Sequence, residues 1–391
     1  MQASLRFRRT LLLAESFLGG LSGSMTTFAI VWASSQYSAV VLGGTLIAGT
    51  IPGLALAFVG GALADRVDAR RLLFLGSLLS GAILLFAAVW LCWSPGAIVF
   101  IVLNLARSVL GALLGSSVFV LVPALFPEEE LVRTNASLSL ADDAAYLFGP
   151  LLAAGLFSLS GAEGTMLVAA AMSVAAGLLL LALPAIPRSE AGQPLNLAFL
   201  GAGAAYLVRT PSAAAVAFYF AVTNLFAAAF QVATPLYAAT LGGAVAYALL
   251  SSAMNLGMTA SNLALSALAL RSSERLIFSA GVVQGLAMAG LGRSRSLPLA
   301  ASFGALNDAM ANVSGTVFVS HLQAVLPEAL LGRVFSAVNA LAMGLTPLGF
   351  TAAPWLIDRL GVAPAIVALG LVSSVVSAVF CGLRGCWSKA S

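Results

Sequence analysis

Five ionisable side chains stand inside long apolar stretches of this 391-residue sequence, and they are its first candidates for chemistry: Glu15, Arg107, Asp142, Asp143 and Asp308. A charged group among apolar neighbours loses hydration, so within a bilayer such groups are usually functional. A carboxylate in that setting can bind and release a proton, and a nearby arginine can bias this equilibrium. The residue types therefore indicate proton coupling.

Arg107 and Asp308 are expected near the middle of their apolar stretches. Arg107 follows about ten residues of its stretch, at ~1.5 Å of helix per residue. Asp308 follows Asn307, which stands 200 positions after Arg107, and no second acidic residue shares its depth. Asp308 is therefore the first candidate for proton exchange. The structural alternatives are an Arg107 that only binds backbone carbonyls and an Asp308 that only hydrogen-bonds to Asn307, Asn312 or a neighbouring helix.

Asp142, Asp143 and Glu15 are further proton-coupling candidates. Adjacent helical residues point about 100° apart, so at most one of the two aspartates faces a given cavity fully. The alternative is a pair at the membrane interface, with one aspartate capping and the other solvated. Glu15 stands near the start of its stretch, where it faces a cavity, extends to the interface or pairs with Arg9.

The composition determines the class of protein. Hydrophobic residues make up 61% and charged residues only 8% of the chain, with a mean hydropathy of +1.04. Soluble proteins carry about a quarter charged residues, so this chain belongs in a bilayer. The three cysteines, Cys92, Cys381 and Cys386, and the single His321 show no metal-ligand spacing. No nucleotide-binding motif or paired nucleophile and base is found, so we expect neither an enzyme, nor a cofactor, nor nucleic-acid binding.

Apolar runs predict an all-α membrane protein with twelve transmembrane helices, because each crossing needs about 20 residues. The border between two six-helix halves is a linker in the middle of the chain, where 195–209 is predicted as an interfacial helix. The halves are 1–185 and 212–391, with the linker at 186–211. The predicted spans are 10–34, 39–63, 71–93, 97–123, 134–159, 164–184, 212–239, 244–270, 275–292, 298–325, 334–357 and 362–383.

The distribution of basic residues predicts the orientation. With the N-terminus in the cytoplasm, fourteen of the 18 Lys and Arg residues lie inside, three lie outside and Arg107 lies within a span. Cytoplasmic loops carry such an excess, so both termini are predicted to be cytoplasmic.

The two halves repeat in sequence. After a shift of 200 residues, the Pro-Glu-x-x-Leu-x-Arg pattern at 127–133 falls on the same pattern at 327–333, and Gly149 falls on Gly349. Each half holds an even number of spans, so the copies share one orientation. A pseudo-two-fold axis along the membrane normal follows, with a binding site expected near mid-membrane between the halves.

The charged stretch at 61–71 reads Gly-x-Leu-Ala-Asp-Arg-x-x-x-Arg-Arg and joins two apolar runs. It resembles the loop between spans 2 and 3 of the major facilitator superfamily. The resemblance implies the major facilitator fold and a gating role for Gly61, Asp65, Arg66 and Arg70. In that family the Gly allows close helix approach, while the Asp caps a neighbouring helix and pairs with Arg to latch the halves. The family often has Gly where this chain has Asp68.

Two further motifs resemble the same family. The Arg-x-x-x-Gly-x-x-x-Gly that begins at Arg107 is similar to the span-4 motif of proton-coupled members. Gly149 and Pro150 resemble the antiporter motif of span 5, whose closing glycines are replaced here by Ala153 and Ala154. Pro kinks the helix and small neighbours permit tight packing, which implies a seal in an exporter.

Amides and aromatic residues on repeat-related spans predict a cavity for a bulky amphipathic solute. The predicted cavity residues are Asn104, Asn224, Phe226, Gln231 and Asn307. The alternative is that the phenylalanines face lipid and the amides only join helices.

The runs at 127–136 and 327–336 resemble the bacterial exporter branch that includes macrolide-efflux and siderophore-export proteins. The leading hypothesis is therefore a monomeric, proton-coupled exporter of a hydrophobic or amphipathic small molecule in the bacterial cytoplasmic (inner) membrane, with a role such as multidrug resistance or siderophore export. One alternative is an importer or a lipid flippase on the same fold. The other is a membrane sensor or binding protein that does not transport.

Overall fold

The computed structural model describes residues 2–66, 68–114, 117–184, 205, 209–268, 273–326 and 328–387. These residues form helices and short connections, without a strand. The chain divides into two compact units, Met1–Leu195 and Asn196–Ser391, called here the N-terminal and C-terminal units. Most of the predicted interfacial helix at 195–209 lies outside the described residues.

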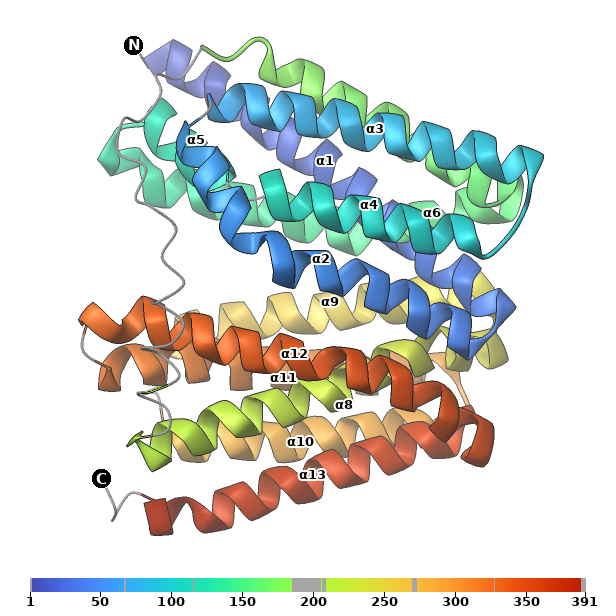
Figure 1. The fold of residues 1–391 in the computed structure, drawn as a ribbon, viewed down its shortest axis with the longest axis vertical. Coiled ribbons are helices and arrows are strands. Elements are labelled where there is room, and N and C mark those ends of the chain that lie inside the picture. The colour runs from blue at the N-terminus through green and yellow to red at the C-terminus, as the bar shows by residue number, and fades with distance from the viewer. Residues whose placement is uncertain are drawn as a thin grey trace. The chain divides into compact units, whose positions relative to one another are not determined.

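The described part of the N-terminal unit contains six helices. Helix α6 packs on α1 and α3, while α2 packs on α4 (Figure 1). The helices are α1 (Gln2–Tyr37), α2 (Ala39–Arg66), α3 (Ala69–Trp93), α4 (Ile98–Leu114), α5 (Ser117–Leu125) and α6 (Glu128–Leu180).

The helices of this unit do not correspond one to one to the predicted spans. Helices α4 and α5 together cover the predicted span 97–123. Helix α6 covers two predicted spans and is interrupted at Ser160 and Gly161, where Gly161 has φ 68°. That left-handed conformation suits glycine, which has no Cβ to clash, so the chain reverses there.

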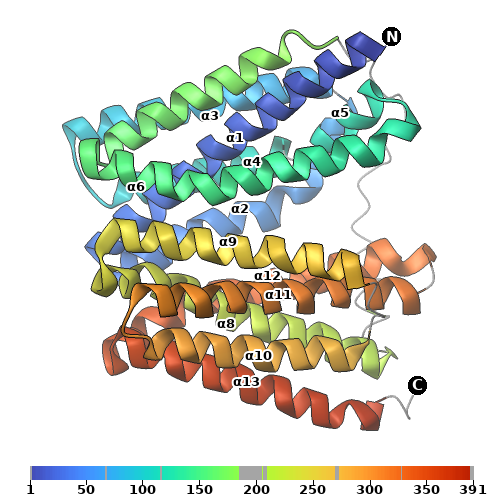
Figure 2. The same ribbon diagram turned by 180° about the vertical axis from the view of Figure 1, so that it is seen from behind.

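Six helices are also found in the residues of the C-terminal unit that the structure describes. Helix α8 packs on α12, and Figure 2 shows α9 beside α11 and α10 beside α13. The helices are α8 (Pro211–Leu241), α9 (Gly243–Leu268), α10 (Glu274–Arg293), α11 (Leu297–Val325), α12 (Glu328–Leu360) and α13 (Val362–Trp387). The predicted all-α fold with twelve helices is thus confirmed for the described residues.

The predicted loop at 61–71 is largely helical. Helix α2 continues to Arg66 and α3 begins at Ala69, so only two residues connect them. The prediction was wrong here because hydropathy marks the part of a helix that crosses hydrocarbon. Backbone hydrogen bonds extend the helix into the polar region until a capping residue ends it.

The sequence repeat corresponds to a repeated helix contact. A Cβ at Gly149 of α6 would collide with the Ser24 hydroxyl of α1. A Cβ at Gly349 of α12 would collide with the Leu225 carbonyl of α8. Ser24 and Leu225 differ by one residue after the shift of 200, so both units place a glycine at the same close approach of two helices.

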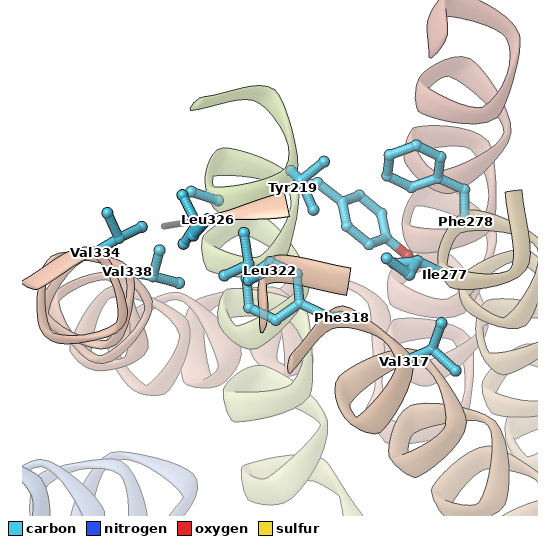
Figure 3. Close-up of a cluster of buried hydrophobic side chains, with 11 residues drawn as sticks. Tyr219, Ile277, Phe278, Val317, Phe318, Leu322, Leu326, Val334 and Val338 are labelled. Carbon is cyan, nitrogen blue, oxygen red and sulfur yellow. The ribbon is translucent and has the colours of Figure 1, made fainter. Parts of the chain in front are cut away.

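An aromatic and aliphatic cluster joins four helices of the C-terminal unit. Tyr219 of α8 meets Phe278 of α10 edge to face, with 4.8 Å between ring centroids, as Figure 3 shows beside Ile277. Phe220 stacks on Phe318 of α11 at 4.7 Å, and Val334 of α12 is fully buried in the cluster. Such pairs fix the relative rotation of helices.

Apolar side chains also cover the outside of the units. Phe86 and Val375 are 63% and 61% exposed, and Trp93 and Leu159 are exposed by more than four-fifths. Six helical stretches of the described chain are long and apolar enough to cross a membrane. An apolar exterior on apolar helices is expected of a protein surrounded by lipid.

Candidate functional site

Three predicted proton-coupling residues of the N-terminal unit gather where α1 meets α6. The Ser16 hydroxyl of α1 donates to Asp142 Oδ1 of α6 at 2.6 Å. Glu15 and Asp143 both lie close enough to Asp142 for their charges to interact. Carboxylates this close repel one another, so a bound proton or cation stabilises the group. The suggested pairing of Glu15 with Arg9 is not found.

Arg9 instead forms an ion pair with Glu130 at the beginning of α6. Its guanidinium also lies over the Phe126 ring, 5.9 Å from the centroid. The pair joins the first turns of α1 to α6, far along the helix from Asp142. It therefore contributes to packing within the N-terminal unit.

Arg107 of α4 contacts α1 and lies near α6. Its Nη2 donates to the Gly23 carbonyl of α1 at 3.5 Å, and Tyr146 of α6 lies near its side chain. Tyr146 follows Asp142 by one helical turn, so the two side chains lie on the same side of α6. Within the described residues Arg107 makes no ion pair, and its role in proton coupling stays a prediction.

Gly149 and Pro150 are buried in the closest part of the α1–α6 contact. The Ser24 hydroxyl donates to the Ala145 carbonyl at 3.0 Å, close to the turn in which Pro150 cannot supply a backbone N–H. Ala153 is fully buried. The antiporter-like motif thus packs tightly within the N-terminal unit, and its role as a seal stays a prediction.

Asn104 joins two helices. Its Nδ2 donates to the Thr45 carbonyl of α2 at 2.8 Å and lies directly against Gly49. This contact matches the structural alternative for an amide that connects spans. Its predicted role in a solute cavity has no further support in the described structure.

The C-terminal unit contains two adjacent cavities. The larger has a volume of about 480 Å³ and includes Asn224 and Phe220. The smaller has a volume of about 280 Å³ and includes Gln231, Asn307 and Asp308. Both are lined by Ala227, Gln284 and Ala311, so they adjoin. Four of the residues singled out in the sequence therefore line this double cavity: Asn224, Gln231, Asn307 and Asp308. Phe226 lines neither part.

Several lining residues had no recognisable signal in the sequence. Gln284 of α10 borders both cavities, and Tyr247 and Ser251 of α9 border the smaller one. Asn312, which the sequence suggested as a hydrogen-bond partner of Asp308, borders the larger cavity and donates to Asn262 Oδ1 of α9 at 2.6 Å. A helical wheel marks one face of each helix, but it does not say which neighbour that face meets.

Asp308 is paired with its neighbour on α11. The Asn307 amide donates to Asp308 Oδ1 at 2.9 Å. Asn307 is only 3% exposed, and its side-chain oxygen has no hydrogen-bond partner in the described part of the chain. Among the described residues, the buried Asn307 oxygen therefore has no partner, and the hydrogen bond from Asn307 occupies only one of the two carboxylate oxygens of Asp308.

The predicted gating residues are described only in part. The side chains of Gly61, Asp65 and Arg66 lie outside the described set. Arg70 donates to the Leu183 carbonyl at 2.6 Å, a contact within the N-terminal unit. Its role in latching the two units stays a prediction.

The cap of α3 is Asp68. Its carboxylate accepts a hydrogen bond from the Arg70 backbone N–H at 3.0 Å and pairs with Arg71 at 3.7 Å. An aspartate directly before the first helical residue is well placed to satisfy a free N–H. The predicted capping of a neighbouring helix by Asp65 concerns a side chain outside the described residues, so it stays a prediction.

Comparisons with known proteins agree with this architecture. The family model of the Major Facilitator Superfamily matches residues 12–350. The solved nucleoside transporter NupG shares 14% identity at a TM-score of 0.75, with 96% of this chain and 98% of that chain covered. No curated protein matches the sequence.

Two further solved structures have the same fold. A POT family transporter in complex with 5-aminolevulinic acid shares 13% identity at a TM-score of 0.72, over 97% of this chain and 96% of that chain. A bacterial homolog to the human lysosomal transporter Spinster, inward-facing and occupied, also shares 13% identity at a TM-score of 0.72, over 97% of each chain. At these identities the likeness concerns the fold. The match of the family model over most of the sequence shows that the chain belongs to the major facilitator superfamily of membrane transporters.

Proposed function

We propose that the protein is a proton-coupled secondary transporter that exports a hydrophobic or amphipathic small molecule by alternating access. The observation that carries this proposal is the double cavity of the C-terminal unit, which combines an aromatic wall with amides and one carboxylate, Asp308. A carboxylate at a solute cavity can exchange a proton for a solute, which is what antiport requires.

Export is favoured over import by the tight packing at Gly149 and Pro150 and by the resemblance of the 127–136 and 327–336 runs to exporters. Nucleoside and peptide transporters have the same fold, but fold alone does not determine the direction or the solute. We further propose a bacterial cytoplasmic membrane location with both termini in the cytoplasm, from the distribution of Lys and Arg.

Flux in liposomes tests the function. The purified full-length protein is reconstituted with a trapped pH dye, and amphipathic solutes are added to one side. We expect solute movement to be accompanied by proton movement in the opposite direction, and an imposed pH gradient to drive solute uphill. Solute flux that does not depend on the pH gradient would contradict the proposed proton coupling. The absence of any solute flux would favour the alternative of a sensor that does not transport.

Cysteine labelling tests the orientation. Glu129→Cys and Ser158→Cys stand at opposite ends of the first half of α6, and both positions are exposed. Cys92, which is also exposed, is first replaced by Ser. In intact cells we expect an impermeant thiol reagent to label Ser158→Cys and to spare Glu129→Cys. The reverse pattern would invert the orientation and the transport direction.

A further inference from the structure

The smaller cavity of the C-terminal unit is rich in hydrogen-bond acceptors and contains no positive charge. Its charged lining residue is Asp308, and none of its described lining residues is Lys, Arg or His. Tyr247 of α9 is the other titratable side chain there, while α8 and α10 contribute none among the described residues. An anionic group placed here would face Asp308 without a compensating cation.

Two acceptors are left free on adjacent residues. Because the Asn307 amide donates to Asp308 Oδ1, the second Asp308 oxygen remains available. The Asn307 oxygen is buried without a partner in the described residues. A buried acceptor without a partner is destabilising, and a ligand donor removes this destabilisation. An ammonium group carries three donors and a charge opposite to that of Asp308, so it can bind both acceptors at once.

The adjoining larger cavity has no charged residue among its described lining residues. Its apolar lining residues include Phe220, Val319 and Ala227. Most of its polar lining groups already donate to protein oxygens, namely Thr223, Asn224, Asn312, Ser314 and Ser320. The two cavities therefore differ in charge, and a molecule with an uncharged, largely apolar part and one charged end would match them together.

We infer that the transported solute carries a protonated amine, which binds Asp308 and the Asn307 oxygen while its apolar part occupies the larger cavity. The inference rests on the proposed function and narrows its substrate class to cationic amphipaths, away from anionic solutes such as carboxylate-rich siderophores. It also explains coupling, because a proton and the ammonium group compete for the same carboxylate.

Three fluorescent probes with one scaffold test the inference by equilibrium binding to the purified full-length protein. They are a dansyl group on a five-carbon chain that ends in a primary amine, the same molecule with the amine acetylated, and a dansyl analogue that ends in a carboxylate. We expect the amine to bind most tightly, the neutral amide less tightly and the carboxylate least. Displacement by the non-fluorescent amine corrects for partition into detergent.

Matched variants assign the effect to the cavity. Asp308→Asn should weaken binding of the amine roughly ten- to a hundredfold, the equivalent of one charge-assisted hydrogen bond, and leave the neutral probe unchanged. Asp358→Asn is the control, because Asp358 is an exposed aspartate of α12 that lines neither cavity. Lower pH should weaken the binding of the amine probe and leave the binding of the neutral probe unchanged. This pH dependence should disappear in Asp308→Asn.

The result that overturns the inference is a carboxylate probe that binds as tightly as the amine, or an Asp308→Asn variant that weakens the amine and the neutral probe equally. Failure of the proposed function looks different. The amine would then bind with the expected selectivity, but the liposomes would show no pH-driven flux. Conversely, the pH gradient could drive the neutral or anionic probe in preference to the amine probe. That result would support the proposed transport function and contradict the inferred amine-binding site.

Discussion

The two units share their packing and differ in their chemistry. Both place a glycine, Gly149 or Gly349, at the closest approach of their first and fifth spans. The N-terminal unit gathers acidic side chains around Asp142 on the α1–α6 contact, whereas the C-terminal unit has one carboxylate, Asp308, in an amide-lined cavity. The two repeated units thus keep the glycine contacts that set the distance between helix backbones, while their polar residues differ.

Positions 107 and 307 show this divergence most clearly. Arg107 makes one long hydrogen bond, 3.5 Å, to the Gly23 carbonyl of α1. Asn307 donates to the adjacent Asp308, and its buried side-chain oxygen has no partner among the described residues. The same site of the repeat thus contacts a backbone carbonyl in one unit and borders the proposed solute cavity in the other.

The largest effect is expected from removing the carboxylate of the cavity. Asp308→Asn keeps the size of the side chain and abolishes titration, so uphill pH-driven efflux from proteoliposomes should fall to the level of empty liposomes, with downhill exchange retained. Asp142→Asn should retain part of the uphill flux, because Asp143 and Glu15 remain nearby. If the two variants show the opposite order, the coupling site lies in the N-terminal unit.

Next in size is the effect of filling the two glycine contacts. Gly349→Ala should lower the stability by about 1–3 kcal/mol, because its Cβ meets the Leu225 carbonyl and lies 2.8 Å from the Ala228 Cβ. Gly149→Ala should lower the stability less, because the nearest atom is the Ser24 side-chain oxygen, which can rotate away, and not a backbone carbonyl. The additional substitution Ser24→Ala should restore part of the lost stability. Thermal unfolding in detergent measures both.

Two glycines on the same helices provide the controls. Gly344 and Gly155 have nothing within 4 Å of a built Cβ. Gly344→Ala and Gly155→Ala should therefore be neutral or stabilising by up to about 1 kcal/mol, since Ala favours helix. A loss at the control positions equal to that at Gly349 would show that helix propensity, and not close packing, determines the result.

A smaller effect is expected from Arg107. Arg107→Lys keeps the charge but loses the planar fork, so it should retain part of the transport rate, whereas Arg107→Gln should retain less. Because the hydrogen bond to Gly23 is long, stability should change little in both variants. Equal and complete loss of transport in the two variants, with stability unchanged, would assign Arg107 a direct part in coupling and weaken the contrast with position 307.

The smallest effect is expected at the ion pair of Arg9 and Glu130. Its counterparts after the shift of 200 are Arg209 and Leu330, so the C-terminal unit has no equivalent pair. A double-mutant cycle with Arg9→Gln and Glu130→Gln should give a coupling of about 1 kcal/mol or less, because both side chains keep access to water. A coupling free energy several times larger would show that this ion pair is a major stabilising interaction of the N-terminal unit.

The amino-acid sequence by itself determined the helices, their approximate limits and the two-fold repeat. Apolar runs of membrane length leave the helix as the way to satisfy the backbone, and a shift of 200 residues aligns the halves. The choice of Asp308, Asn307, Gln231 and Asn224 as candidate residues also needed only their depth and their polarity within apolar surroundings.

Only the tertiary structure decided which of these residues meet. Ser16 and Asp142 are 126 positions apart, and Gln284 reaches the cavity of Asp308 from another helix. Asp68 caps α3, a role that the sequence pattern did not assign to it. The physical reason is that hydropathy and backbone hydrogen bonding act along the chain over a few residues. The rotation of each helix about its own axis depends on side-chain packing with distant partners, such as Ser24 against Gly149 and Leu225 against Gly349.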